Sequence, residues 1–365
     1  MILTFYIARR FVGMFVRVFA IFFGIMMLIE TIDQLRKYSG TTLGLGDAVY
    51  MASLSVPESL YRILPLIVIL ASITLFLGLA RSSELVVVRA AGRSGLRFLA
   101  APVVAALVIG MLAVAVFNPL VAATSKQYDT LSALYEANGG SVMSVSGDGL
   151  WMRQGDAAGQ SVIKAARANP DGGTLQGVTF LTFLPDGTPA QRIEAKTAEL
   201  RPGQWVLTGV KRWNLASGNP ERDATALPDG LTLATDLTTE RIRNSFGAAT
   251  DVAFWNLPRY IKDLERAGFS ARSHRVWLQM ELALPLLLAS MVLIAAGFTM
   301  RHARFGQTGS MVLLALTGGF MIFFLRNFAQ VLGENSQIPI LIAAWIPPVA
   351  AIMLALGLLL HLEDG

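Results

Sequence analysis

The sequence predicts an α-helical integral membrane protein with six transmembrane helices and an antiparallel β domain inserted after the third helix. Hydrophobic residues make up 54% of the 365 residues, and the mean hydropathy is +0.54, well above an ordinary soluble chain. Six apolar runs each approach or exceed the roughly 18–20 residues that a helix needs to cross a bilayer. They cover residues 11–29, 63–80, 98–123, 282–300, 308–325 and 338–360.

The first apolar run is predicted to be a retained anchor, because it is long and no small-residue cleavage pattern precedes the polar stretch at Asp33. Arginines flank the short loops on one side of the six spans. They are Arg9, Arg10, Arg81, Arg89, Arg93, Arg97, Arg301 and Arg304. The positive-inside rule places that side, and both chain termini, in the cytoplasm. Residues 126–274 are then expected on the opposite side.

Between residues 149 and 237, short segments rich in β-branched and aromatic residues alternate with turn signals, which predicts an antiparallel sandwich, a jelly roll or a curved half-barrel. The sequence "PDGT" at residues 185–188 indicates a hairpin, since Asp-Gly readily takes positive φ angles. Cysteine is absent, so this domain must be stabilised by a hydrophobic core. A packing domain without a ligand remains an equal alternative.

The chain offers no recognisable catalytic machinery. It contains neither a G-x-S-x-G motif nor a phosphate-cradling G-x-x-x-x-G-K-[ST] motif. The histidines, His274, His302 and His361, lack the spacing of metal ligands. Net charge is a modest +5 with no basic run typical of nucleic-acid binding. We therefore expect no cofactor, metal or nucleic acid in this chain, and any work against a gradient must draw its energy from elsewhere.

Basic residues gather near the outer ends of the spans, where the positive-inside rule does not place them. The candidates are Arg36, Lys37, Arg62, Arg275 and Arg326. Ionisable groups at membrane depth tend to face bundle interiors or substrate paths, and arginine with lysine suits phosphate groups. A lipid with a phosphorylated head group fits this pattern. The alternative is a set of snorkelling side chains or local ion pairs, such as Glu58 with Arg62 at i,i+4.

The stretch "RSSELVVVRAAGRSGLR" at residues 81–97 predicts a short amphipathic helix over residues 82–92 on the cytoplasmic side. Ser82 or Ser83 serves as the helix cap, and Glu84 lies in the first turn, where the helix dipole favours an acid. One interpretation is a helix lying on anionic lipid. The other is a docking helix for a cytoplasmic ATPase, with Glu84 meeting a basic residue of that partner.

The motifs "DQLRKY", "SVPESLYRILP", "RSSELVVVRAAG" and "IPILIAAWIP" resemble those of the LptF/LptG family of lipopolysaccharide-export permeases, the LptG branch more closely. The resemblance runs the length of the chain. It implies six transmembrane helices, in residues 1–125 and 275–365, and a periplasmic β-jellyroll in residues 126–274. It also implies a bacterial inner-membrane complex with an LptF-like permease, an LptB-like ABC ATPase dimer that uses ATP, and an LptC-like protein leading to a periplasmic bridge.

The resemblance also assigns roles to residues. Arg36 and Lys37 match a basic pair that contacts lipopolysaccharide phosphates. Arg62 is a substitute for a lysine that relatives carry where this chain has Glu58. The pattern of cations near the outer ends of the spans, and not the resemblance, adds Arg275 and Arg326 to the expected phosphate-binding set. The coupling segment that seats in the ATPase is expected to act through Glu84, Leu85, Val88 and Arg89.

Three alternatives to this reading stay open. A lipoprotein-release or mechanotransmission permease also couples an ATPase to an external domain, but such chains usually have four spans. A membrane-anchored scaffold needs no ATPase partner. A membrane-embedded enzyme fits worst, because no nucleophile–base or carboxylate pair occurs within the spans.

Overall fold

The structure, a computed structural model, divides into two compact units. We call them the helical unit, Met1–Leu131, Ala253–Trp255 and Arg275–Gly365, and the β unit, Ser132–Val252 and Asn256–His274. The sequence-based boundaries were 125/126 and 274/275. The structure describes residues 2–39, 44–82, 84, 95–135, 143–146, 149–156, 159–169, 173–184, 187–215, 219–235, 237–238, 249–266, 269–300 and 308–363.

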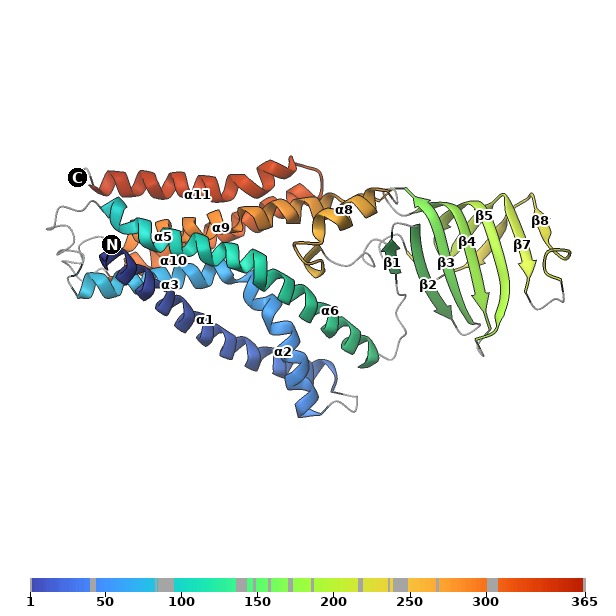
Figure 1. Cartoon of the computed structure of the whole chain (residues 1–365), viewed down its shortest axis with the longest axis horizontal. Coiled ribbons are helices and arrows are strands. Elements are labelled where there is room, and N and C mark those ends of the chain that lie inside the picture. The colour runs from blue at the N-terminus through green and yellow to red at the C-terminus, as the bar shows by residue number, and fades with distance from the viewer. Residues whose placement is uncertain are drawn as a thin grey trace. The chain divides into compact units, whose positions relative to one another are not determined.

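Within these described residues, six helices are long and apolar enough to cross a membrane, as the sequence predicted. They are α1 (Ile2–Lys37), α3 (Leu64–Arg81), the continuous helix α5–η1–α6 (Gly95–Leu112, Ala113–Phe117, Asn118–Tyr135), α9 (Arg272–Thr299), α10 (Thr308–Glu334) and α11 (Ile340–Glu363). Shorter helices are α2 (Leu45–Arg62), η2 (Ala249–Asp251) and α8 (Leu257–Arg266). Together with the antiparallel sheet, these helices confirm the predicted fold class (Figure 1).

Prolines mark several breaks and distortions in the helices, since proline has no N–H to donate to the carbonyl four residues earlier. Pro65 follows the break at Ile63 that separates α2 from α3. Pro119 follows the single π-helical turn η1. Pro285 lies in the middle of α9, so the carbonyl of Glu281 lacks its helical donor.

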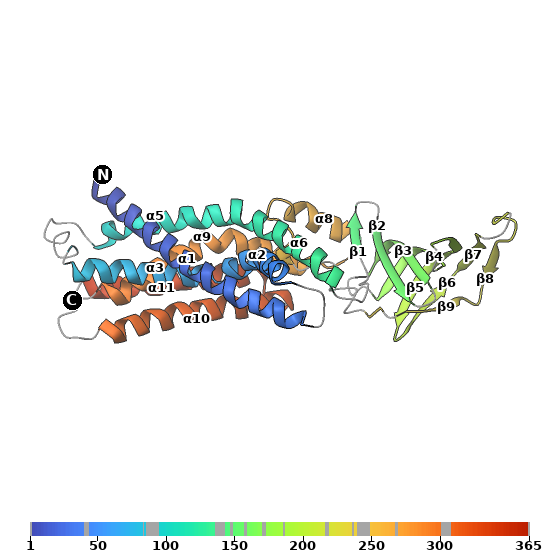
Figure 2. The same cartoon turned by 90° about the horizontal axis from the view of Figure 1, so that it is seen from below.

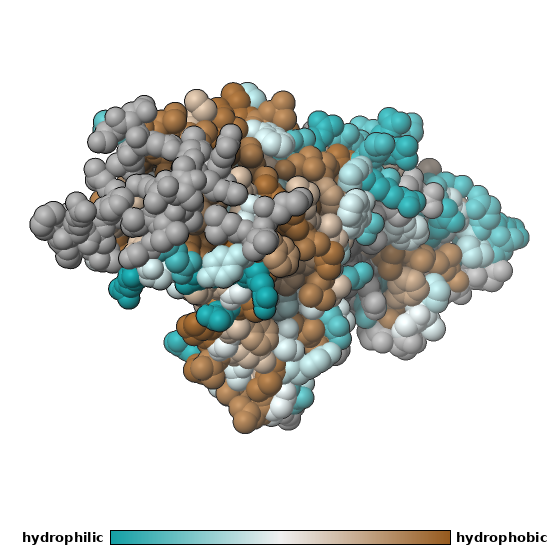
Figure 3. All heavy atoms as spheres, turned by 60° about the vertical axis from the view of Figure 1, so that its left-hand side comes forward, coloured by the Kyte–Doolittle hydropathy of each residue, from teal (hydrophilic) through white to brown (hydrophobic). Residues whose placement is uncertain are grey.

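The helices differ sharply in how much of their apolar surface the chain itself covers. In the most apolar stretch of α9, 78% of the residues are buried, whereas the values for α1 and α10 are 0% and 17%. Both ribbon views show α9 within the bundle and α1 at its edge (Figures 1 and 2). The space-filling view shows hydrophobic side chains spread over the exposed helices (Figure 3). α1 and α10 therefore offer apolar faces to lipid or to another membrane protein.

Two adjacent glycines bring α10 close to its neighbours. A Cβ added at Gly319 would lie 2.2 Å from Ile69 Cδ1 of α3. A Cβ at Gly318 would lie 3.3 Å from Ile294 Cγ2 of α9. Small residues allow such approaches because they leave the helix backbone uncovered. α10 is thus held between α3 and α9.

The β unit contains one antiparallel sheet with strand order β1-β2-β3-β4-β5-β6-β9, and β7 pairs with β5 and β8. The strands are β1 (Met143–Ser146), β2 (Gly149–Asp156), β3 (Gly159–Ala168), β4 (Thr174–Phe183), β5 (Pro189–Arg201), β6 (Gln204–Thr208), β7 (Val210–Asn214), β8 (Thr225–Leu227) and β9 (Leu231–Ala234). The long strand β5 pairs with β6 and then with β7 along one edge. Gly209, with φ of 63°, supplies the bend between them.

A continuous apolar core lines the inside of the sheet, as expected for a domain without disulfides. Trp205 is fully buried and meets Phe180 in an edge-to-face contact, with ring centroids 6.3 Å apart. The predicted hairpin joins β4 to β5: Leu184 N–H donates to Thr188 O at 2.9 Å, and Gly187 has φ of 84°. Asp-Gly sequences favour such turns because glycine takes positive φ without a Cβ clash.

Candidate functional site

An apolar cavity in the helical unit lies where α1, α3 and α10 meet, and its volume is about 740 Å³. Such a volume is in the range of ligand pockets, which are about 300–1,000 Å³. Phe22 and Met26 of α1 face Leu66 and Leu70 of α3, and Phe320 and Phe324 of α10 complete the wall. Methionine and phenylalanine form an adaptable surface. We call this the α10 cavity.

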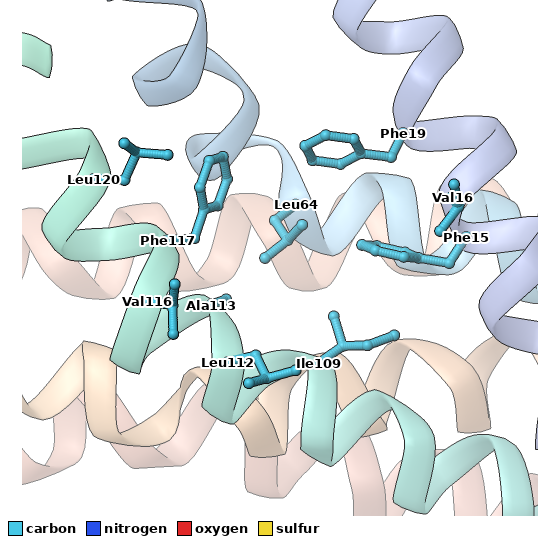
Figure 4. Close-up of a pocket in the computed structure, with 10 residues that line it drawn as sticks. All are labelled: Phe15, Val16, Phe19, Leu64, Ile109, Leu112, Ala113, Val116, Phe117 and Leu120. Atoms are coloured by element: carbon cyan, nitrogen blue, oxygen red, sulfur yellow. The ribbon is translucent and has the colours of Figure 1, made fainter.

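A second apolar cavity of about 400 Å³ lies where α1 faces the π-helical turn (Figure 4). Phe15 and Phe19 come from α1, Leu64 from the start of α3, and Ala113 and Phe117 from η1. Figure 4 shows the rings of Phe15, Phe19 and Phe117 pointing into the same space. One helix, α1, therefore borders both cavities, so a movement of α1 changes both.

Two residues just before α8, Phe254 and Trp255, form hydrogen bonds at the π-helical turn. Trp255 donates its Nε1–H to the carbonyl of Ala115 at 3.0 Å. That carbonyl is four residues before Pro119, which has no N–H to occupy it. The backbone N–H of Phe254 donates to Asn118 Oδ1 at 2.8 Å. These contacts hold a π-helical turn, a feature often found at functional sites, in a defined conformation.

A buried polar cluster joins four helices inside the helical unit. Tyr61 of α2 donates its hydroxyl hydrogen to Glu281 Oε2 of α9, and Glu281 is 0% exposed. Asn118 of α6 hydrogen bonds to this pair, and the guanidinium of Arg326 of α10 interacts with it electrostatically. A carboxylate buried in a membrane is costly unless such groups compensate it. The cluster therefore fixes how α2, α6, α9 and α10 pack.

Polar contacts also tie the outer part of α1 to its neighbours. Glu30 accepts hydrogen bonds from Ser55 Oγ at 3.0 Å and from Ser59 Oγ at 2.9 Å, both on α2. Gln34, which is buried, donates to Tyr128 of α6 at 3.0 Å. The outer end of α1 is thus held in place just before the predicted basic pair.

The five predicted phosphate-binding residues fall into different environments. Arg36 and Lys37 end α1 and are exposed, and Lys37 Nζ lies 5.0 Å from the ring centre of Tyr38. Arg275, in the first turn of α9, is also exposed. Arg62 is exposed and forms an ion pair with Glu58 at 2.7 Å. Arg326 is only 8% exposed.

These cations do not all lie at one depth, although the sequence suggested a common level. The Ser59–Glu30 contact aligns α2 with α1, which run in opposite directions. Arg36 is six residues beyond Glu30, toward the outer end of α1. Arg62 is three residues beyond Ser59, in the opposite direction along the helix pair. At about 1.5 Å per helical residue, Arg62 lies about 13 Å deeper than Arg36 along the helices. Arg36 and Lys37 form the outer basic pair, and Arg326 belongs to the buried cluster.

The predicted ATPase-coupling segment is described only in part. Leu85, Val88 and Arg89, and most of residues 82–92, lie outside the described residues. Glu84 is described, and its carboxylate accepts hydrogen bonds from Arg10 Nη1 at 2.7 and 2.9 Å. Ser82 Oγ donates at 2.7 Å and Tyr6 OH at 3.4 Å. Burial opposes ionisation of Glu84, but these donors outweigh it and lower the pKa of the carboxyl.

Sequence reasoning missed Arg10 as a partner of Glu84, and Tyr61 and Asn118 as partners of Glu281. Tyr61 stands in the motif "SVPESLYRILP", but no periodicity shows that its hydroxyl meets a carboxylate 220 residues later. Among the residues that the structure describes, no group of three or more His, Cys, Asp or Glu side chains is placed to hold a metal ion.

Comparison with known proteins matches residues 5–361 to the family described as lipopolysaccharide export system permease LptF/LptG. The lipopolysaccharide export system permease protein LptG of Escherichia coli strain K12 is 25% identical over 340 residues, covering 92% of this chain and 91% of that protein. The protein of the same name from Haemophilus influenzae is 22% identical over 376 residues, 98% of each chain. The predicted resemblance is confirmed: this multi-pass membrane chain belongs to the LptF/LptG family of lipopolysaccharide export system permeases.

Proposed function

We propose that this chain is a permease subunit that extracts lipopolysaccharide from the bacterial inner membrane and passes it toward a periplasmic bridge. The family match over residues 5–361 carries the proposal. It is supported by the exposed apolar faces of α1 and α10, which flank the α10 cavity, and by the outer basic pair. Acyl chains enter between these helices, and the phosphates meet Arg36 and Lys37.

The chain supplies no nucleotide-hydrolysing motif, so we propose that a separate LptB-like ABC ATPase dimer provides the energy. An LptF-like permease covers the apolar faces that this chain leaves exposed, and an LptC-like protein receives the lipid. Both termini lie in the cytoplasm, and the β unit lies in the periplasm. Glu84, with Leu85, Val88 and Arg89, forms the contact with the ATPase.

The direct test is photo-crosslinking in the complete complex in native membranes. A photoreactive amino acid replaces Phe320, which lines the α10 cavity. The control replaces Met353 of α11, which is 67% exposed but lines neither cavity. We expect an adduct with lipopolysaccharide at position 320 and little or none at 353. Equal labelling at both positions, or an adduct with a lipoprotein instead, contradicts the proposed substrate.

The role of the outer basic pair has its own test. Replacing Arg36 and Lys37 by glutamine removes two positive charges at exposed side chains. We expect lipopolysaccharide release from proteoliposomes to fall at least several-fold, since phosphate contacts in a partly apolar setting are charge-assisted. The matched control is Arg167→Gln with Lys196→Gln in the β unit, which changes the net charge equally. Unchanged release in the Arg36 and Lys37 variant contradicts the assignment.

The ATPase contact is tested by Glu84→Arg. Reversal of this charge is expected to abolish co-purification of the ABC ATPase, because the predicted contact pairs the acid with a basic residue of the partner. If the ATPase still co-purifies and lipid release is unchanged, the coupling role of Glu84 is wrong. A scaffold without transport predicts that outcome together with no lipid adduct at position 320.

A further inference from the structure

The carboxylate of Glu84 is already occupied by donors of its own chain. Its Oε1 accepts from Arg10 Nη1 at 2.7 Å and from Ser82 Oγ at 2.7 Å. Its Oε2 accepts from Arg10 Nη1 at 2.9 Å and from Tyr6 OH at 3.4 Å. A carboxylate offers about four lone-pair positions. Arg10 Nη1 lies within hydrogen-bond distance of both oxygens, and Ser82 and Tyr6 each add a donor, so a partner's cation that approaches Glu84 competes with these donors.

Arg10 is the donor that links distant parts of the fold. It lies on α1, 74 residues before Glu84, and its side chain passes over Gly78 near the end of α3. A Cβ added at Gly78 would lie 3.8 Å from Arg10 Nη2, so the glycine leaves a surface on which the guanidinium rests. Arg10 Nη1 also donates to Tyr6 OH at 2.9 Å, which orients the tyrosine toward the same carboxylate.

The Arg10–Glu84 ion pair holds the two side chains together in the free chain, but another cation can replace Arg10 at little cost. The side chains of Arg10 and Glu84 remain 26% and 35% exposed. Ion pairs that water reaches contribute little to stability, typically less than about 1 kcal/mol. A cation of the partner that buries the Glu84 carboxylate forms a stronger pair than Arg10 does, because removal of water strengthens the electrostatic attraction.

We propose that Arg10 masks Glu84, and that docking of a basic residue of the ATPase on Glu84 displaces Arg10 and frees the Arg10 and Tyr6 side chains, while Ile7 and Phe11 keep the first turns of α1 packed. This rests on the proposed function, in which Glu84 receives the ATPase. Because α1 borders both apolar cavities, a change in the contacts near its N-terminal end links ATPase docking to the helix that lines the lipid-facing wall. Arg10 is thus a positioning residue that sets how readily the ATPase engages.

The test measures the affinity of the purified ABC ATPase dimer for the complete permease complex in nanodiscs. Arg10→Gln removes the competing donor and is expected to tighten binding about two- to five-fold, the ratio that an exposed ion pair of this class supports. Arg9→Gln is the matched control, because Arg9 is exposed, adjacent and carries the same charge. Tyr6→Phe removes one weak donor and is expected to give a smaller gain. Arg10→Lys keeps the charge and is expected to stay near the parent affinity.

A second readout follows α1 itself. The chain has no cysteine, so Phe5→Cys, at a position 72% exposed, creates a single site for a nitroxide spin label. We expect the label to become more mobile when the ATPase binds, and to be mobile from the start in Arg10→Gln. Weaker ATPase binding by Arg10→Gln, an equal change in Arg9→Gln, or a label that ATPase binding leaves unchanged overturns the proposal.

Glu84→Gln separates this inference from the proposed function. If Glu84→Gln weakens ATPase binding and Arg10→Gln does not strengthen it, Glu84 docks the ATPase but Arg10 does not mask it. If neither variant changes binding, the docking role of Glu84 fails and the masking proposal fails with it. The lipid adduct at position 320 reports on the substrate independently of both outcomes.

Discussion

The buried cluster around Glu281 makes a strong prediction about the stability of the helical unit. Glu281→Ala removes the acceptor of the Tyr61 hydroxyl and the carboxylate that compensates the buried Arg326 guanidinium. Leaving a buried donor without its acceptor typically costs about 1–3 kcal/mol, and the buried guanidinium also loses a favourable electrostatic interaction. Because Glu281 is 0% exposed, water does not replace the lost contacts. We expect a loss of that size in the free energy of unfolding.

Two further variants separate charge from hydrogen bonding. Tyr61→Phe leaves one carboxylate oxygen without its donor and is expected to cost about 1–3 kcal/mol. The double variant Glu281→Leu with Arg326→Met removes both charges and is expected to recover most of the loss, since apolar replacement of buried ion pairs is often neutral. The measurement is unfolding of the purified complex by sodium dodecyl sulfate titration, followed by circular dichroism. A loss below about 0.5 kcal/mol for Glu281→Ala, or no recovery in the double variant, refutes the reasoning.

Three other predictions follow from the packing, the linker and the masked carboxylate. Gly319→Leu forces a side chain into Ile69, so α3 and α10 must separate, and we expect a loss of about 1–3 kcal/mol or more in the same unfolding assay. Trp255→Phe removes the donor to the Ala115 carbonyl, and we expect about 1 kcal/mol less protection of residues 113–118 in amide hydrogen exchange. The pKa of Glu84 is lowered from its ordinary 4.5, so its contact with Arg10 of α1 is complete above pH 4.5 and is lost as the pH falls through the lowered pKa. We expect a spin label at position 5 to report this loss as increased mobility.

Each of these predictions has a control within the chain. Gly24→Ala is expected to leave stability nearly unchanged, because nothing lies within 4 Å of an added Cβ there. Trp345→Phe, which loses a bond to Gln279 of α9, is expected to leave exchange at residues 113–118 unchanged. Glu84→Gln is expected to remove the acid-dependent change in label mobility. Full stability of Gly319→Leu, or acid-induced mobility that persists in Glu84→Gln, contradicts the structural explanation.

The sequence alone determined the number of spans, the fold class and the family. Length and apolar composition suffice for the spans, because crossing about 30 Å of hydrocarbon demands a helix of known length whatever its neighbours are. The β hairpin at Gly187 was predictable for a similar reason, since an Asp-Gly turn depends on backbone freedom within a few residues. The motifs "RSSELVVVRAAG" and "SVPESLYRILP" carried the family resemblance, which the match over residues 5–361 confirms.

Only the tertiary structure decided what the charged residues contact. Arg326 and Arg62 look alike in the sequence, as cations near the outer ends of spans, yet one is buried beside Glu281 and the other is exposed and paired with Glu58. Glu84 carries a local signal as a helix-start acid, but its partner Arg10 lies 74 residues away on α1. Hydropathy patterns show which segments insert into the membrane or become buried, but they contain no information on how the helices are rotated relative to one another. That rotation is set by close contacts such as Gly319 against Ile69, and it decides which polar groups meet.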